Sequence, residues 1–391
     1  MIYLKRNIIC VFVFFYVFSS ILLCTKSYAK DEGLDVKSKS VVVIEGSTGE
    51  VIYEKDKNMR LNPASITKIM TLLLVYEDLE NDKIKLTDDV CVSEHAASMG
   101  GSQVFLEPGE IQNVETMIKC ISIASANDAA VAMAEHIAGS ETEFVARMNK
   151  KAEKLGMKNT CFKNCCGLDI EGHYSSALDV AIMSRELICN YPQITKYTTT
   201  WMDTFVHKTR KGEKEFGLTN TNKLVRSYNG ITGLKTGSTS LAKYCLSATA
   251  RRNEIDIIAV VMGAPEHKLR YSEAAKLLDY GFSKAKLYEH KIDKKLLMNI
   301  KVKDGTMDYI DGYVKEPYRY AKIDNKDNNI RYRVKINDLR APIHKKQKIG
   351  VVEYCKNGKI IKKQDILSKD TCYKNRYVDE IYKLLKRLIC T

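Results

Sequence analysis

Short β-branched runs and longer segments with one apolar face alternate along this chain, and they predict strands and helices respectively. Ser40–Glu45 and Val51–Glu54 flank the turn Gly46–Gly49 and predict a β-hairpin. Further strands are predicted over residues 231–235, 244–249 and 255–262. Helices are predicted over residues 67–80, 113–122, 127–138, 141–155, 175–189 and 268–282. Because strands lie at both ends of a helical middle, we expect an α+β fold in which helices cover an antiparallel sheet.

The pattern changes after residue 286. Residues 287–375 alternate short apolar and charged runs with Asp-Gly and Asn-Gly turns, which predicts a small all-β domain. Residues 376–391 predict an amphipathic helix suited to lying in a membrane interface. The alternative for this helix is docking on the β domain. Its apolar face consists of Tyr377, Val378, Ile381, Leu384, Leu385, Leu388 and Ile389.

The first 29 residues have the pattern of a secretory signal peptide. Lys5 and Arg6 precede the uncharged run Ile8–Leu23, and Ser27 and Ala29 are small residues at a cleavage site. An uncleaved membrane anchor is the alternative. We therefore expect an exported protein at the outer face of the cytoplasmic membrane or in the cell wall, with a signal peptide over 1–29, a first domain over 30–286, a β domain over 287–375 and a tail helix over 376–391.

Composition and charge narrow the possible partners. The 391 residues are 45% hydrophobic and 28% charged, which is typical of a globular protein of about two domains. Residues 30–286 carry 33 basic and 34 acidic side chains, whereas residues 287–375 carry 22 and 12, a net +10. This charge favours an anionic membrane surface as a partner of the C-terminal region. Nucleic acid is not expected, because the exported chain has no nucleic-acid-binding module. The cysteines are irregularly spaced, so we expect most of them to be buried free thiols.

Three short segments could carry chemistry. Ser65 and Lys68 stand three residues apart at a predicted helix start, so a neutral lysine could take the serine proton. Ser125 and Asn127 lie at the break between two apolar helices, where they could act on a substrate or simply cap a helix. Lys235–Ser238 ends a predicted strand, and Gly233 and Gly237 flank Lys235 and Thr236 so that a ligand backbone could pair with the strand edge.

The ordered set S-x-x-K, S-x-N and K-T-G resembles the signature of penicillin-binding proteins and serine β-lactamases. Within this group, residues 36–286 are most similar to the low-molecular-mass D-alanyl-D-alanine carboxypeptidases, and the β domain and tail match that family's layout. Within that family, the chain is most similar to the sporulation-linked carboxypeptidases found in spore-forming bacteria. The resemblance also rests on Asn62–Ser65, Gly167–Leu168, Gly172–Ser175, Asn220–Leu224 and Leu277–Phe282.

The resemblance implies roles for the residues that would break the peptide bond. Ser65 would be the acylated nucleophile and Lys68 its base. Ser125 would relay a proton to the leaving D-alanine. The backbone N–H groups of Ser65 and Ser238 would form the oxyanion hole.

The resemblance also implies how the substrate would be held. The substrate would be a peptidoglycan stem peptide ending in D-Ala-D-Ala, and β-lactam antibiotics would be covalent inhibitors. Asn127 would bind the substrate amide, Lys235 would support the proton relay, and Thr236 would contact the terminal carboxylate. Gly237 would line the strand edge that binds the substrate. Arg270 would be a second carboxylate partner, with a solvated helix residue as its alternative reading. No cofactor and no metal are implied.

Three other functions remain open. A secreted serine β-lactamase would need a glutamate that positions water, and Glu186 with Asn190 offers a similar spacing inside a predicted helix. A non-catalytic, penicillin-binding structural protein could share the fold. A zinc carboxypeptidase would need a ligand array, yet no H-E-x-x-H or comparable array is present. The histidines that follow a glutamate are His95, His136, His267 and His290.

Overall fold

The computed structural model describes residues 34–209, 212–324, 326, 329–356, 358–376, 378 and 381. The predicted signal peptide lies outside these residues, as does the predicted tail helix apart from Arg376, Val378 and Ile381. All elements below belong to the compact unit that begins at Lys37. No helix within the described ranges has both the length and the apolar character needed to cross a membrane.

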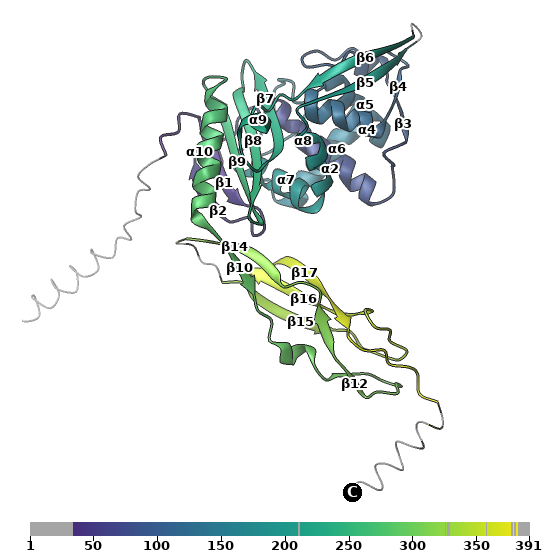
Figure 1. Cartoon of the computed structure of the whole chain (residues 1–391). Helices are drawn as coiled ribbons and strands as arrows, with labels where there is room; N and C mark the ends of the chain where they lie inside the picture. Colours follow the sequence, from purple (N-terminus) through teal and green to yellow (C-terminus); the bar gives the residue numbers. More distant parts are fainter. Residues whose placement is uncertain are drawn as a thin grey trace, which may run out of the picture. The chain divides into compact units, whose positions relative to one another are not determined.

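A five-stranded antiparallel sheet forms the centre of the first domain, with the order β2-β1-β9-β8-β7 (Figure 1). β1 pairs with β2 on one side and with β9, more than 200 residues later, on the other, so the sheet joins both ends of the domain. The strands are β1 (Ser40–Glu45), β2 (Val51–Lys55), β7 (Ile231–Thr239), β8 (Lys243–Arg252) and β9 (Ile255–Ala264).

Helices cover both faces of this sheet. Successive strand residues point to opposite sides, so each strand contributes side chains to the packing on both faces. On one side, Gly281 of α10 (Leu269–Lys284) packs against Val43 and Ile257. On the other side, Val42, Ile44 and Ile258 join the main hydrophobic core with the remaining helices. These are α2 (Lys68–Glu80), α4 (Val114–Lys119), α5 (Asn127–Ala138), α6 (Glu141–Leu155) and α7 (Ala177–Asn190). The predicted α+β fold is confirmed.

Shorter elements connect these layers. The helical ones are η1 (Ala64–Thr67), α3 (Glu94–Ala97), the π-helical turn η2 (Cys120–Ala124), η3 (Pro192–Ile194), α8 (Thr195–Thr198) and α9 (Leu224–Ser227). The extended ones form two two-stranded antiparallel sheets, β3 (Asp89–Cys91) with β4 (Ile111–Asn113) and the hairpin β5 (Met202–Thr209) with β6 (Gly212–Thr219).

The sequence predicted the bounds of some helices and strands accurately and missed others. The predicted helix 141–155 is confirmed at both ends, because Ser140 caps its N-terminus and Gly156 ends it with a φ of 75°. The predicted helix over 113–122 is present as an α-helix over Val114–Lys119 that continues as a π-helical turn over Cys120–Ala124 and ends at Ser125 with a φ of 63°. The β5–β6 hairpin was not predicted, because most of its side chains are exposed and polar and give only a weak alternation.

The C-terminal residues form the predicted β domain with its own core, which includes Ile349, Val352, Tyr354 and Ile366. Its main sheet has the order β13-β17-β16-β15, and two-stranded sheets pair β10 with β14 and β11 with β12. The elements are β10 (Ala285–His290), η4 (Lys294–Leu297), β11 (Ile300–Lys301), β12 (Tyr309–Ile310), β13 (Gly312–Val314), β14 (Tyr318–Ile323), β15 (Arg331–Ile336), β16 (Lys348–Lys356) and β17 (Lys359–Ser368).

The cysteines of the described ranges are all free thiols in this structure. The buried ones are Cys120, Cys165, Cys166, Cys245 and Cys372.

Candidate active site

Ser65 and Lys68 meet at the junction between η1 and α2. Ser65 lies in the 3₁₀ turn, which begins after Pro63, and Lys68 is the first residue of the α-helix. Lys68 Nζ lies 3.2 Å from Ser65 Oγ. The predicted pairing of these two side chains on one face of the helix start is therefore present.

Lys68 is fully buried and is held by two further oxygen atoms. Its Nζ donates to Asn127 Oδ1 and, over 2.8 Å, to the backbone carbonyl oxygen of Cys166. Burial lowers the pKa of Lys68, and nearby negative charge offsets this only in part. A neutral amine has two N–H bonds, which the two carbonyl oxygens can take. Its lone pair then faces Ser65 Oγ, which is the geometry of a general base.

The break between η2 and α5 brings Asn127 to Lys68 and places Ser125 two residues before it. Ser125 adopts the left-handed conformation and is buried, and Asn127 follows as the first residue of α5. Asn127 Nδ2 donates to the carbonyl oxygen of Gly100 over 2.6 Å, and its backbone N–H donates to Ser102. The Asn127 amide is thereby fixed with its oxygen toward Lys68.

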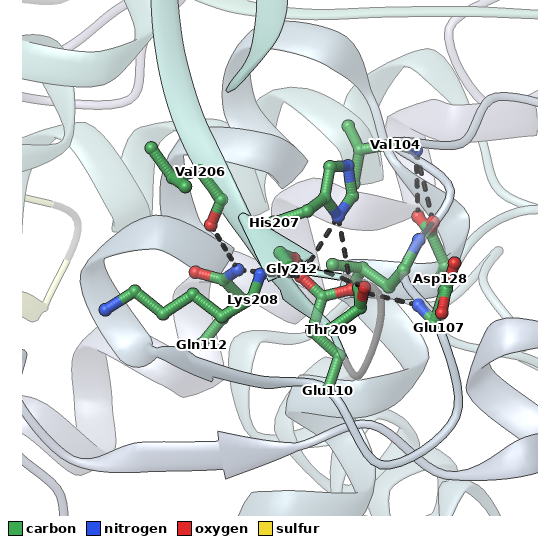
Figure 2. A network of polar contacts seen from close by, with 11 residues as sticks. Val104, Glu107, Glu110, Gln112, Asp128, Val206, His207, Lys208, Thr209 and Gly212 are labelled. Carbon is green, nitrogen blue, oxygen red and sulfur yellow. Dashed lines mark hydrogen bonds and ion pairs between the residues drawn. The ribbon is translucent and has the colours of Figure 1, made fainter. Parts of the chain in front are cut away.

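The next residue, Asp128, fastens the loop that holds Asn127 (Figure 2). Its carboxylate accepts hydrogen bonds from the backbone N–H groups of Val104 and Leu106, both over 3.1 Å. It also accepts from the N–H of Ala129. Burial raises the pKa of Asp128, and the backbone donors offset part of this effect. Asp128 therefore links the start of α5 to the loop of residues 100–106.

Lys235 enters the site from β7. It is almost completely buried, and its Nζ donates to the carbonyl oxygen of Thr236 over 3.2 Å. Burial lowers the pKa of Lys235 well below its usual value, and its proximity to Lys68 and Arg270 lowers it further. The two lysines of the sequence motifs therefore lie close enough to influence each other.

Gly237 lets β7 pass directly beside the 3₁₀ turn that contains Ser65. A Cβ atom at Gly237 would lie 3.0 Å from the backbone nitrogen of Ser65, 3.0 Å from that of Ile66 and 2.9 Å from the carbonyl oxygen of Pro63. Any side chain at this position would therefore push the strand away. The approach brings the exposed residue after it, Ser238, next to the turn that contains Ser65.

Arg270 lies behind β7 in α10 and is buried, so the solvated alternative is wrong. Its guanidinium donates to the carbonyl oxygen of Gly237 over 3.1 Å and to the hydroxyl of Tyr271 over 2.7 Å. Its Nε is buried without a partner within the described structure. The Tyr271 hydroxyl in turn donates to the carbonyl oxygen of Thr221, whose side chain accepts from Thr236.

Several contributors were not identified from the sequence. Gly167 has a φ of 91°, and a Cβ atom there would lie 1.9 Å from the carbonyl oxygen of Ala64. The Cys166 carbonyl and the Gly100 carbonyl hold Lys68 and Asn127. Backbone carbonyls have no signature in residue type, but the glycines near both positions are the signal that could have indicated a close approach.

The residues of the alternative functions lie in other contacts. Glu186 in α7 pairs with Lys151 over 3.1 Å. His95 pairs with Glu141, and His267 and His290 pack against tyrosine rings. Among the residues that the structure describes, no group of three or more His, Cys, Asp or Glu side chains is placed to hold a metal ion.

Comparison with known proteins gives the same two-part division. Residues 25–266 match the D-alanyl-D-alanine carboxypeptidase family (peptidase S11), and residues 282–374 match the C-terminal domain of penicillin-binding protein 5. The D-alanyl-D-alanine carboxypeptidase DacF of Bacillus subtilis (strain 168) is 46% identical over 359 residues, which cover 90% of this chain and 91% of the relative. DacC of Escherichia coli (strain K12) is 33% identical and covers 86% of this chain and 84% of its own length.

Solved structures show the same similarity. A peptidoglycan synthesis regulatory factor (PBP3) from Streptococcus pneumoniae has a TM-score of 0.68 at 27% identity, covering 86% of this chain and 99% of that protein. Penicillin binding protein 5 from Haemophilus influenzae has a TM-score of 0.63 at 30% identity, covering 87% and 98%.

Proposed function

This chain belongs to the D-alanyl-D-alanine carboxypeptidase family, and we propose that Ser65 is the nucleophile with which it removes the terminal D-alanine from peptidoglycan stem peptides. It is a serine-type hydrolase of the low-molecular-mass penicillin-binding protein group. The observation that carries the assignment of Ser65 is its contact with the buried Lys68, whose amine is also held by Asn127 and Cys166.

In the acylation step, the neutral Lys68 amine takes the proton of Ser65 as Oγ attacks the carbonyl carbon of the penultimate D-alanine. The carbonyl oxygen becomes negatively charged between the backbone N–H groups of Ser65 and Ser238, and the passage of Gly237 beside Ser65 supports this placement. The C–N bond then breaks. Ser125, supported electrostatically by Lys235, passes the proton that Lys68 took from Ser65 to the nitrogen of the departing D-alanine, so that Lys68 is neutral again.

In the deacylation step, water attacks the ester on Ser65. Lys68 removes a proton from the water, and the ester oxygen leaves as the Ser65 hydroxyl with a proton returned to it. The same buried amine thus acts in both halves of the reaction. A β-lactam would acylate Ser65 in the same way, and its ring-opened product would remain on the serine.

The substrate is held on both sides of Ser65. Asn127 binds the substrate amide, and the edge of β7 at Thr236, Gly237 and Ser238 pairs with the peptide. Thr236 contacts the terminal carboxylate. Arg270 contributes its charge from behind Gly237, since its guanidinium donates to the Gly237 carbonyl.

We also propose the domain limits and the location. The carboxypeptidase domain spans 30–286 and the β domain 287–375, supported by their separate hydrophobic cores. A signal peptide over 1–29 exports the chain. The tail of residues 376–391 lies on the anionic outer surface of the cytoplasmic membrane, with attraction from the net +10 of the β domain.

The test is incubation of the purified protein with labelled penicillin, followed by mass mapping. One adduct per chain is expected on the peptide containing Ser65, and Ser65→Ala should remove both the adduct and the release of D-alanine while the protein stays folded. D-Alanine release should be blocked by penicillin and unaffected by a strong chelator. Full labelling of the Ser65→Ala protein would contradict the assignment. Release that survives penicillin but stops with the chelator would favour a metallopeptidase.

The carboxylate site has its own test. Arg270→Ala should reduce turnover of a peptide with a free C-terminal carboxylate by roughly 30-fold to 1000-fold, as for loss of a charged partner. Turnover of the corresponding C-terminal amide should fall much less. Equal losses on both substrates would show that Arg270 acts only by supporting β7.

A further inference from the structure

His173 is a buried histidine. It contacts Thr67, which lies between Ser65 and Lys68 in the chain. It belongs to the segment 161–175, which forms one isolated bridge between Cys161 and Tyr174 and another between Ser175 and Leu61. Leu61 lies three residues before the 3₁₀ turn Ala64–Thr67, which contains Ser65 and is called the nucleophile turn below. His173 is therefore held on a piece of chain that is already tied to the approach to Ser65.

The hydrogen bonds of His173 determine which ring nitrogen carries the proton. The backbone N–H of Lys163 points at Nδ1 over 3.0 Å, and a backbone N–H can only donate. Nδ1 must therefore be the unprotonated nitrogen. Burial lowers the pKa of His173 to about 4, so the ring is neutral at physiological pH. The single proton is then on Nε2, which lies 2.8 Å from Thr67 Oγ1 and donates to it.

Thr67 connects this ring to the catalytic residues. It is completely buried, and it stands between Ser65 and Lys68 as the last residue of η1. One ring nitrogen thus bonds to the nucleophile turn, and the other bonds to the backbone of Lys163.

The loop that begins at Lys163 contains the backbone that orients the general base. The carbonyl oxygen of Cys166 accepts from Lys68 Nζ, and Gly167 packs against the carbonyl of Ala64. The carbonyl of Cys165 accepts from the Thr71 hydroxyl over 2.6 Å in the first turns of α2. If the start of the loop moved away from Thr67, the Cys166 carbonyl would no longer be fixed relative to Lys68.

From these contacts we propose that His173 is a positioning residue for acylation: its neutral ring, protonated on Nε2, fastens loop 163–168 to Thr67 and so fixes the Cys166 carbonyl that orients Lys68. The proposal rests on the proposed roles of Ser65 and Lys68. His173 does not touch the substrate, so its loss should slow acylation without changing where the adduct forms.

The test compares second-order rates of acylation by a fluorescent penicillin in the full protein and its variants. His173→Asn can keep the bond to Lys163 but cannot reach Thr67. Thr67→Val removes the acceptor and keeps the shape. Each should reduce the acylation rate between about 10-fold and about 100-fold, as expected when a catalytic group is misplaced by a fraction of an ångström to 1 Å. The double variant should lose little more than either single one, because both remove the same link.

Phe162→Leu is the matched control. Its ring packs edge-on against His173, with 5.9 Å between ring centroids, but its side chain takes no part in the hydrogen bonds. It should lower the melting temperature at least as much as His173→Asn and leave the acylation rate within about twofold of the original. An equal loss of acylation in Phe162→Leu, or acylation of His173→Asn and Thr67→Val at the original rate, would overturn the proposal.

Two further readouts separate the possible failures. Nitrogen NMR of the folded protein at pH 7 should show His173 neutral with the proton on Nε2, and an imidazolium or the other tautomer would overturn the proposal. If His173→Asn does not fold, Thr67→Val still decides the outcome. Failure of the proposed function appears separately, because the original protein would then carry its adduct on a residue other than Ser65.

Discussion

The backbone carbonyl oxygen of Cys166 lies 2.8 Å from the side-chain nitrogen of Lys68, although 98 residues separate them in the chain. This contact and the one to Asn127 use both hydrogens of a neutral lysine and leave its lone pair for Ser65. In the proposed mechanism, the reactivity of Ser65 therefore depends on a loop that shares no sequence motif with it.

The pH dependence of acylation should follow the lowered pKa of Lys68. Because only the neutral amine can take the Ser65 proton, the acylation rate should rise with pH through this pKa, which lies below the usual 10.5. Lys68→Arg stays charged and should reduce the rate by about 10²-fold to 10⁴-fold. Stopped-flow acylation measured from pH 5 to pH 11 checks both. A rate that begins to rise only near pH 10.5 would contradict the role of Lys68.

Gly167→Ala should disrupt the nucleophile turn. The new Cβ would collide with the Ala64 carbonyl, and the φ of 91° is unfavourable for alanine. We expect a loss of about 2–4 kcal/mol in the free energy of unfolding and a loss of acylation of more than about 100-fold. Gly156→Ala is the control, since its φ of 75° is similar but its Cβ would meet nothing within 4 Å. It should cost about 1 kcal/mol and leave acylation unchanged. Equal effects of both variants would show that the Ala64 contact is unimportant.

Asp128→Asn should loosen the loop that holds Asn127. Val104 and Leu106 both donate to Oδ2, and Ala129 donates to Oδ1. An amide offers one acceptor oxygen where the carboxylate offers two, so either the N–H of Ala129 or those of Val104 and Leu106 lose their partner. Acylation should fall about 10-fold, the equivalent of one hydrogen bond, and hydrogen exchange at residue 129, or at residues 104 and 106, should accelerate. Asp179→Asn is the control, because Asp179 is also a buried carboxylate that accepts from a backbone N–H, in its case that of Asn159. Its variant should leave acylation unchanged, and the opposite ranking would contradict the link to Asn127.

His207→Ala should affect stability and not chemistry. Glu110 is buried directly before β4. It accepts hydrogen bonds from His207 Nδ1 in β5 over 3.0 Å and from the side-chain amide of Gln112 in β4 (Figure 2). These bonds join β5 to β4. Removal of the histidine leaves the carboxylate buried with fewer partners, at a cost of about 2–4 kcal/mol. Denaturant unfolding checks the loss, with acylation by penicillin as the internal control. A loss below about 1 kcal/mol, or acylation slowed as much as in Asp128→Asn, would contradict this assignment.

Removal of residues 376–391 should abolish binding to anionic liposomes. The proposed helix places its apolar face in the interface and its basic residues near the headgroups. Flotation with and without the tail, at low and moderate salt, measures the effect. If the truncated protein floats equally well, the tail is not the anchor. If neither protein floats and truncation lowers the melting temperature of the β domain, the tail is a helix docked on that domain.

The sequence by itself determined the features that depend on neighbours in the chain. The spacing of Ser65 and Lys68 places both on one face of a helix start, and Ser140 and Gly156 fix the ends of α6 through local capping. The ordered motifs also indicated the family. These features are short-range, since helix geometry and backbone conformation act over a few residues.

Only the tertiary structure decided which distant groups complete the site. The Cys166 carbonyl, the packing of Gly167 on Ala64 and the bond from His173 to Thr67 join segments about 100 residues apart. Arg270 could have been a solvated helix residue, and its burial behind Gly237 became visible only with the sheet in place. The physical reason is that a backbone carbonyl is the same in every residue type, so its role depends on the path of the folded chain and not on the residue that carries it.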